Sequence, residues 1–152
     1  MKKIALVPGT FDPITIGHVD IIDRALLMFD EVWIGIGRNS IKQSLFSEEK
    51  RRTWIEQIYG TNSKVKVEAY EGLTTDFCRK INAHFIIRGI RTTADFDYEK
   101  NIAQMNKAQC PDIESIFLMC NPAFTAISST IVRDIIRNGG DASQFVPAQI
   151  KL

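Results

Sequence analysis

Apolar positions along the chain follow two alternating patterns. Short apolar runs, which suit buried strands, are separated by stretches in which apolar residues recur every three or four positions, as on one face of a helix. Val19, Ile22 and Leu26 are an example of the helical spacing. The apolar runs predict strands at residues 4–7, 32–36, 65–69, 85–87 and 115–119. The segments between and after them predict helices at residues 17–29, 48–59, 75–82, 94–108 and 129–138.

Some of these helices carry signals at their ends. Ser47 and Ser128 precede helical segments and can cap their free N–H groups. Glu48 and Glu49 fall in a first helical turn, where the helix dipole favours acidic side chains. Gly139 follows the last segment, as is typical of a helix C-terminus.

Strands that alternate with helices are typical of a parallel sheet with helices on both faces. We therefore predict an α/β fold with a doubly wound, Rossmann-like sheet of five parallel strands. The 152 residues are expected to form a single domain, 1–152, since domains commonly have about 100–150 residues. Ligands of such sheets bind beyond the carboxyl ends of the strands, where the strand order reverses. Functional residues are therefore expected in the segments that follow the strands.

Composition and charge exclude several classes of protein. Hydrophobic residues make up 45% and charged residues 24%, as in ordinary globular domains. The formal net charge of +1 argues against bulk binding of nucleic acid. The apolar runs are too short for a membrane span or a signal peptide, and the three cysteines form no CxxC pair. We expect a cytoplasmic protein that binds neither nucleic acid nor membranes.

The segment after the first strand carries the strongest candidate chemistry. Gly9 and two prolines stiffen it, Thr10 offers a hydroxyl group, and His18 falls in the first turn of the next helix, where free N–H groups favour anions. A single histidine near a helix start is as often a packing residue as a functional one. Here it closes an eleven-residue loop between a strand and a helix, which favours a functional role. The loop is not a Walker A motif, because it lacks Gly-Lys-Ser/Thr.

Two arginines follow the fourth predicted strand. Arg88 and Arg91 flank a glycine and an isoleucine at its carboxyl end, where a phosphate group would suit their guanidinium groups. Salt bridges to Asp95, Asp97 or Glu99 are the alternative interpretation.

Weaker signals follow the other strands. Lys42 comes after the second strand, and Thr74 lies in a segment after the third strand that most simply forms a turn and a helix cap. Ser129 and Thr130 add hydroxyl groups at a helix start beyond the cap that Ser128 can provide. Together with the histidine and the arginines, these groups predict a polyphosphate site at one edge of the sheet. No residue is placed as a covalent nucleophile, and no acidic cluster suggests a metal cage.

As a set, these motifs resemble a known family. Pro-Gly-Thr-Phe-Asp-Pro at 8–13, followed by Thr-Ile-Gly-His at 15–18, resembles the first signature of the bacterial phosphopantetheine adenylyltransferases. This family belongs to the nucleotidyltransferase superfamily with a (T/H)-x-G-H motif. Residues 88–91 with 95–99 resemble its second block, and residues 115–119 with 127–132 resemble its third. The resemblance runs in order over nearly the whole chain.

The resemblance implies transfer of the adenylyl group of ATP to 4'-phosphopantetheine, giving dephospho-coenzyme A and pyrophosphate by direct in-line attack. His18 would stabilise the α-phosphate in the transition state, and Arg91 would hold the β- and γ-phosphates. The implied catalytic residues are His18, Thr10, Lys42 and Arg91. The implied phosphopantetheine-binding residues are Thr10, Lys42, Thr74 and Arg88. The implied ATP-binding residues are Thr10, Phe11, His18, Gly89, Ile90, Arg91, Glu99, Phe124, Thr125, Ala126, Ile127, Ser128, Ser129 and Thr130.

The resemblance also implies Mg²⁺ as a cofactor, held mainly through ATP, a homohexameric assembly and feedback binding of coenzyme A. The chain departs from the usual family pattern at Val7, Thr74 and Phe124, which concerns the pantetheine and nucleotide pockets. Two other hypotheses stay open. One is a related nucleotidyltransferase that acts on nicotinamide mononucleotide or a phosphorylated alcohol, and the other is a non-catalytic nucleotide sensor.

Overall fold

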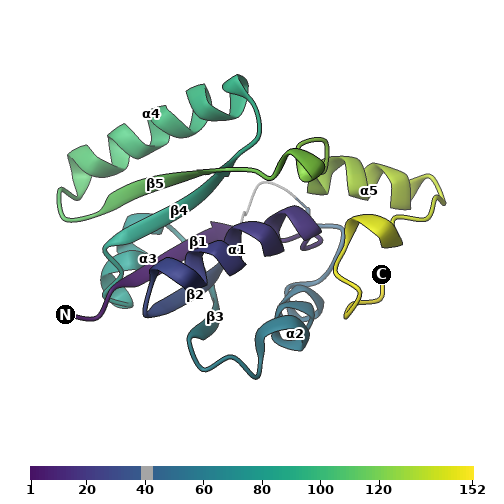
Figure 1. Cartoon of the computed structure of the whole chain (residues 1–152), viewed down its shortest axis with the longest axis horizontal. Helices are drawn as coiled ribbons and strands as arrows, with labels where there is room; N and C mark the ends of the chain where they lie inside the picture. The colour runs from purple at the N-terminus through teal and green to yellow at the C-terminus, as the bar shows by residue number, and fades with distance from the viewer. Residues whose placement is uncertain (39–42) are drawn as a thin grey trace.

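The computed structural model describes residues 1–38 and 43–152. These residues form one parallel sheet, with the strand order β3-β2-β1-β4-β5. The chain runs outward from β1 through β2 to β3 and then returns to the other side of β1, so the strand order reverses between β1 and β4 (Figure 1). The strands are β1 (Ile4–Gly9), β2 (Glu31–Gly37), β3 (Val65–Tyr70), β4 (Phe85–Ile90) and β5 (Glu114–Met119).

Helices cover both faces of the sheet, which confirms the predicted doubly wound α/β fold. The helices α1 and α2 pack on one face, α3 and α4 pack on the other, and α5 lies beyond the carboxyl ends of the strands (Figure 1). Their bounds are α1 (Ile16–Met28), α2 (Glu48–Tyr59), α3 (Thr74–Lys80), α4 (Thr93–Gln109) and α5 (Ser129–Arg137). Within the described ranges, no helix has the length and apolarity needed to cross a membrane.

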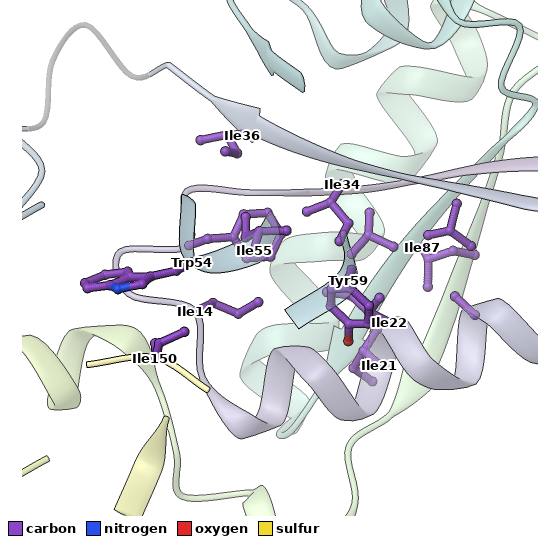
Figure 2. Packing of buried hydrophobic residues seen from close by; sticks show 14 of the residues in the cluster. Ile14, Ile21, Ile22, Ile34, Ile36, Trp54, Ile55, Tyr59, Ile87 and Ile150 are labelled. Atoms are coloured by element: carbon purple, nitrogen blue, oxygen red, sulfur yellow. The ribbon is translucent and has the colours of Figure 1, made fainter. Parts of the chain in front are cut away.

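The alternation of side chains along the strands divides the core into two clusters. Ala5 and Val7 of β1 belong to the cluster that includes α1 and α2, whereas Leu6 between them belongs to the cluster with α3. Figure 2 shows the first cluster, in which Trp54 of α2 and Ile150 near the C-terminus lie around the same core. Each buried aliphatic side chain contributes about 1.5–3 kcal/mol to this packing.

The ends of the elements refine the predicted boundaries. The Ser47 and Ser128 hydroxyl groups accept hydrogen bonds from backbone N–H groups three residues later, so both predicted caps are confirmed. In contrast, α3 begins after Leu73 without a side-chain cap, so the cap predicted at its start is wrong. Strand β4 continues through Arg88 to Ile90, three residues beyond the prediction. Arg88 therefore lies in the strand and not after it.

Candidate active site

Two adjoining cavities lie at the carboxyl edge of the sheet, where the strand order reverses. The smaller cavity has a volume of about 310 Å³ and lies between the loop after β1, the end of β4 and the start of α5. The larger cavity, of about 800 Å³, extends between the ends of β2 and β3 and helix α4. The residues that line both cavities are Pro8, Gly9, Thr10, Arg88 and Glu99. Two ligands bound in these cavities would therefore meet at one shared wall.

The loop after β1 forms a rigid aromatic support for His18. A Cβ atom at Gly9 would lie 3.1 Å from the Phe11 ring, so a residue without a side chain lets the ring fold back against the strand. Phe11 has a φ of 49° and is buried. Its ring packs against the His18 ring in a T-shaped arrangement, with 5.1 Å between the ring centroids. This packing fixes the direction in which the imidazole faces the smaller cavity.

Thr15 and His18 form a reciprocal capping box at the start of α1. The backbone N–H of Thr15 donates to Nδ1 of His18 at 2.9 Å, and the backbone N–H of His18 donates to the Thr15 hydroxyl oxygen at 3.3 Å. Burial is the main reason that the pKa of His18 is lowered to about 4, and the charges of Arg88 and Arg91 lower it further. The ring is therefore neutral at pH 7.

Arg88 forms the boundary between the cavities. Its Nε and Nη2 atoms donate to the two carboxylate oxygens of Glu99 at 3.0 and 2.6 Å, and its Nη1 donates to the Pro8 carbonyl at 2.6 Å. The predicted salt bridge to Glu99 is thus present. Because Arg88 also lines both cavities, the salt bridge holds the guanidinium group at the shared wall.

Arg91 is held in a similar way in the smaller cavity. Its Nε and Nη2 atoms donate to Asp95 at 3.0 and 3.2 Å, and its Nη1 donates to the Ile127 carbonyl at 3.3 Å. Burial acts to raise the pKa of Asp95, but the hydrogen bonds from Arg91 outweigh it and the net pKa is lowered. The remaining candidate partner, Asp97, lies 3.9 Å from Lys100 instead.

The start of α5 supplies hydroxyl groups to the same cavity. Ser129 donates its hydroxyl hydrogen to the Pro13 carbonyl at 2.9 Å and so ties α5 to the loop after β1. The Thr130 hydroxyl accepts from Arg133 at 3.2 Å. The smaller cavity therefore combines a neutral imidazole, an arginine and a helix N-terminus, a set that suits an anion with several oxygens.

The larger cavity has a different character. The Tyr70 and Thr74 hydroxyl groups lie 2.9 Å apart, and the Tyr70 ring stacks on Phe77 with 4.6 Å between centroids. Burial raises the pKa of Tyr70. Tyr98 and Ile102 of α4 form much of the opposite side. This cavity suits a longer, partly apolar molecule with a few polar groups.

Buried charges tie the loop after β1 to the segment before α2. The Asp12 carboxylate accepts from the backbone N–H groups of Leu45 and Phe46 at 2.8 and 2.9 Å. Arg51 donates to the Thr10 carbonyl at 2.6 Å and to the Phe46 carbonyl at 3.1 Å. Sequence reasoning assigned no role to Arg51, although a basic residue at an otherwise core-facing helix position is a signal for one.

Comparison with known proteins identifies the family. A model of the Cytidylyltransferase-like family matches residues 6–135. A phosphopantetheine adenylyltransferase of Christiangramia forsetii is 49% identical over 99% of both chains, and one of Flavobacterium psychrophilum is 48% identical over all of this chain and 99% of its own. The chain belongs to the phosphopantetheine adenylyltransferases. The family predicted from the motifs is thus confirmed, and this member is a nucleotidyltransferase.

A solved structure supports the fold of this adenylyltransferase. A bifunctional NMN adenylyltransferase/ADP ribose pyrophosphatase of Francisella tularensis superposes with a TM-score of 0.73 at 23% identity. The match covers 96% of this chain and 45% of the other. At this identity the likeness concerns the fold alone.

Most residues predicted for the adenylyltransferase site come together. Thr74 and Arg88 line the larger cavity. Ile90, Phe124, Thr125 and Ala126 line neither cavity, and Lys42 lies outside the described residues. The residues along the smaller cavity are Thr10, Phe11, His18, Arg88, Gly89, Arg91, Glu99, Ile127, Ser128, Ser129 and Thr130. Sequence reasoning missed Tyr70, although this residue lies at the carboxyl end of β3, where functional residues are expected.

The described residues of the adenylyltransferase provide few side chains that could bind a metal ion without help from a ligand. Across residues 1–38 and 43–152, no three His, Cys, Asp or Glu side chains are grouped as metal ligands. Asp95 and Glu99, the carboxylates along the smaller cavity, are both paired with arginines. A metal ion there would need most of its ligands from a bound nucleotide and water.

Proposed function

We propose that this chain transfers the adenylyl group of ATP to 4'-phosphopantetheine, giving dephospho-coenzyme A and pyrophosphate, the penultimate step of coenzyme A biosynthesis. The observation that carries the proposal is the shared wall of the two cavities, at Thr10 and Arg88. The smaller cavity has hydrogen-bond donors for the phosphates of a nucleoside triphosphate, and the larger cavity has room for a pantetheine arm. The two substrates would place their reacting phosphates at the wall.

The chemistry is a displacement at the α-phosphorus of ATP. An oxygen of the acceptor phosphate attacks, the bond from the α-phosphorus to the bridging oxygen breaks, and pyrophosphate leaves. The attacking phosphate is already ionised at neutral pH, so no general base is required. Catalysis then rests on positioning and on donors that stabilise charge at the α-phosphate. His18, neutral and facing the smaller cavity, is the proposed donor at that centre.

Most of the other proposed nucleotide contacts line the smaller cavity. Arg91, Ser129 and Thr130 are proposed to hold the β- and γ-phosphates at the start of α5. The backbone of Gly89 and the side chain of Glu99 are proposed to contact the rest of ATP. The remaining residues that the family resemblance implies are also proposed as ATP contacts, namely Phe11, Ile90, Phe124, Thr125, Ala126, Ile127 and Ser128.

The proposed acceptor contacts among the described residues line the larger cavity. Arg88 is proposed to bind the phosphate of phosphopantetheine, assisted by Thr10, and Thr74 is proposed to contact the arm. Lys42 is proposed to join Thr10 at the acceptor phosphate. Feedback binding of coenzyme A would use the same cavity, since coenzyme A contains the same arm.

ATP is proposed to enter as its Mg²⁺ complex, in the cytoplasm. The pairing of Asp95 with Arg91 and of Glu99 with Arg88 leaves the cavity without a free carboxylate cluster among its described residues. The Mg²⁺ ion is therefore assigned to the phosphates of ATP and to water.

A homohexamer is proposed as the working assembly. Helix α4, which lies wholly within the described part of the chain, buries only Glu99. Tyr98 and Met105 on this helix are 68% and 62% exposed, and Met119 at the end of β5 is 67% exposed. A second copy of the chain is the proposed cover for this surface. Light scattering after gel filtration should give six times the 17.2 kDa of one chain, and a monomer mass would refute the assembly.

A panel of acceptors tests the reaction. The purified chain is mixed with ATP and Mg²⁺ and with 4'-phosphopantetheine, nicotinamide mononucleotide or a phosphorylated alcohol, and pyrophosphate release is measured. Dephospho-coenzyme A should form, with 4'-phosphopantetheine as the preferred acceptor. Preference for another acceptor would indicate the related nucleotidyltransferase, and ATP binding without any product would indicate a sensor.

A further inference from the structure

Side chains from α2 and α5 bind the backbone of the loop after β1. The carbonyl groups of Thr10, Asp12 and Pro13 each accept a hydrogen bond from one of these helices. The donors are, in the same order, Arg51 at 2.6 Å, Arg133 at 2.9 Å and Ser129 at 2.9 Å. A carbonyl oxygen carries partial negative charge and repels a phosphate, whereas a backbone N–H attracts one. Because the two arginines line neither cavity, their hydrogen bonds direct two of these oxygens away from a phosphate bound there.

The peptide between Thr10 and Phe11 is the one that lies nearest to both cavities. Strand β1 pairs with β2 only as far as Gly9, so the Thr10 carbonyl lies beyond the ladder. The Phe11 N–H belongs to the same trans peptide and points the opposite way from this carbonyl. Phe11 is 1% exposed, and its N–H donates to no acceptor among the described residues. A buried N–H requires a partner, and Phe11 lines the smaller cavity, so a ligand in that cavity is the natural acceptor.

The backbone of Phe11 is strained in this arrangement. Its φ of 49° lies in the left-handed region, which a residue with a side chain rarely adopts. Half a turn of the peptide between Thr10 and Phe11 would bring this φ to about −130°, within the extended region that suits phenylalanine. The same rotation would direct the Thr10 carbonyl to the place where the N–H now points. The local backbone therefore favours an orientation that opposes anion binding, and a contact from elsewhere in the fold has to prevent it.

We propose that Arg51 is a positioning residue, which holds the Thr10 carbonyl towards α2 so that the Phe11 N–H faces the phosphate in the smaller cavity. The guanidinium group is well placed for this, since Arg51 is 6% exposed and its Nε also donates to the Phe46 carbonyl at 3.1 Å. Its hydrogen bond to Thr10 is charge-assisted and therefore strong enough to oppose the strain. The identity of the phosphate as part of ATP rests on the proposed function, whereas the orientation of the peptide does not.

Substitutions on α2 test this role by kinetics. Arg51→Met keeps the length of the side chain but removes its donors, so kcat/KM for ATP should fall about 10- to 100-fold, the scale of a misplaced donor. Arg51→Lys keeps one charged donor and should lose only about three- to tenfold, and it is the variant to measure if Arg51→Met does not fold. Arg52→Met is the matched control, because Arg52 donates to the Val67 carbonyl on β3, and its kcat/KM should stay within about twofold. Equal losses in the methionine variants would contradict the role of Arg51.

A core substitution on the same helix separates positioning from stability. Ile55 of α2 is fully buried, so Ile55→Val should lower the thermal stability and leave kcat/KM for ATP unchanged at temperatures where the chain is folded. Arg51→Met should lower both. If Arg51→Met lost thermal stability alone, as Ile55→Val does, the positioning role would be excluded.

The orientation of the peptide can be observed directly. The chain has nine phenylalanines, so labelling with ¹⁵N-phenylalanine gives few amide signals, and Phe11→Leu assigns that of Phe11. Addition of ATP should shift the Phe11 amide signal in the unmodified chain and in Arg52→Met, but not in Arg51→Met. A crystal structure of Arg51→Met should show a negative φ at Phe11 in place of 49°. A Phe11 amide that ignores ATP in the unmodified chain, or a retained positive φ in Arg51→Met, would overturn the proposal.

The two proposals can fail separately. If no acceptor yields product but ATP shifts the Phe11 amide only when Arg51 is present, the proposed function is wrong and the role of Arg51 stands. If Arg51→Met forms dephospho-coenzyme A as fast as the unmodified chain, the function stands and the role of Arg51 is wrong.

Discussion

The two cavities differ in how firmly their polar groups are held. In the smaller cavity, His18 is bound by Thr15, Arg91 by Asp95 and Ser129 by the Pro13 carbonyl. The larger cavity has the Tyr70–Thr74 pair on one side and the exposed surface of α4 on the other. If the proposed function holds, donors are preorganised where charge develops in the reaction, and the arm of the acceptor meets a more open surface.

The largest expected effect comes from the centre of the smaller cavity. His18→Ala should lower kcat by about 10²–10³-fold, because it removes a donor to the transition state. The dissociation constant for ATP, measured by calorimetry, should change by less than about threefold, because the other phosphate contacts remain. Loss of ATP binding in this variant would show that His18 holds ATP in the ground state as well as in the transition state.

The two arginines should separate the cavities by substrate. Arg91→Ala should raise the KM for ATP about 10- to 100-fold, and Arg88→Ala should raise that for phosphopantetheine by a similar factor, since each loses charge-assisted hydrogen bonds to a phosphate. Steady-state kinetics with each substrate varied in turn measures both. Arg137→Ala, at the end of α5 and outside the lining of either cavity, is the matched control. If both variants raised the KM values for ATP and for phosphopantetheine equally, the two cavities would act as one binding site.

Acid should weaken the fold through His18. The pKa of this ring is about 6.5 in the unfolded chain and about 4 in the folded one, so the unfolded state binds a proton first as the pH falls. Stability is therefore lost as the pH falls from about 6.5 towards 4. The loss at pH 5 should be about 1–2 kcal/mol. Urea unfolding at pH 7 and pH 5 should show this loss in the unmodified chain and a smaller one in His18→Gln.

The smallest expected effect lies in the larger cavity. Tyr70→Phe and Thr74→Val each remove one partner of the hydroxyl pair, so the KM for phosphopantetheine should rise about two- to fivefold. The KM for ATP should stay the same in both variants. An effect on ATP of equal size would show that the larger cavity is not specific for the acceptor.

The fold could be predicted because each signal for it is local. The bounds of α2 match the prediction at both ends, since Ser47 and the two glutamates mark its start. The end of β4 was missed because Arg88 and Gly89 interrupt the apolar run, although their backbone continues to pair with β5. Pairing between strands depends on residues far apart in the sequence, so the local pattern of apolar residues does not predict it.

The site could be predicted in part for the same reason. Thr10 and Arg91 could be expected at this edge because they directly follow the carboxyl ends of β1 and β4, and His18 because it falls in the first turn of the next helix. The hydrogen bonds of Asp12 to backbone groups more than 30 residues away depend on the folded arrangement and have no local signal. The pairing of Arg88 with Glu99 could be stated only as one of several alternatives, because the choice depends on how α4 lies against β4.

The alternation along β4 constrains how this enzyme can change over evolutionary time. Ile86 lines the larger cavity, Ile87 and Gly89 line the smaller one, and Arg88 reaches both. Inserting or deleting one residue in this strand would exchange the two sets, because side chains alternate with a period of two. Substrate preference can therefore diverge by substitution in β4 or by changes of length in the loops, but a change of length in this strand would disrupt both cavities together.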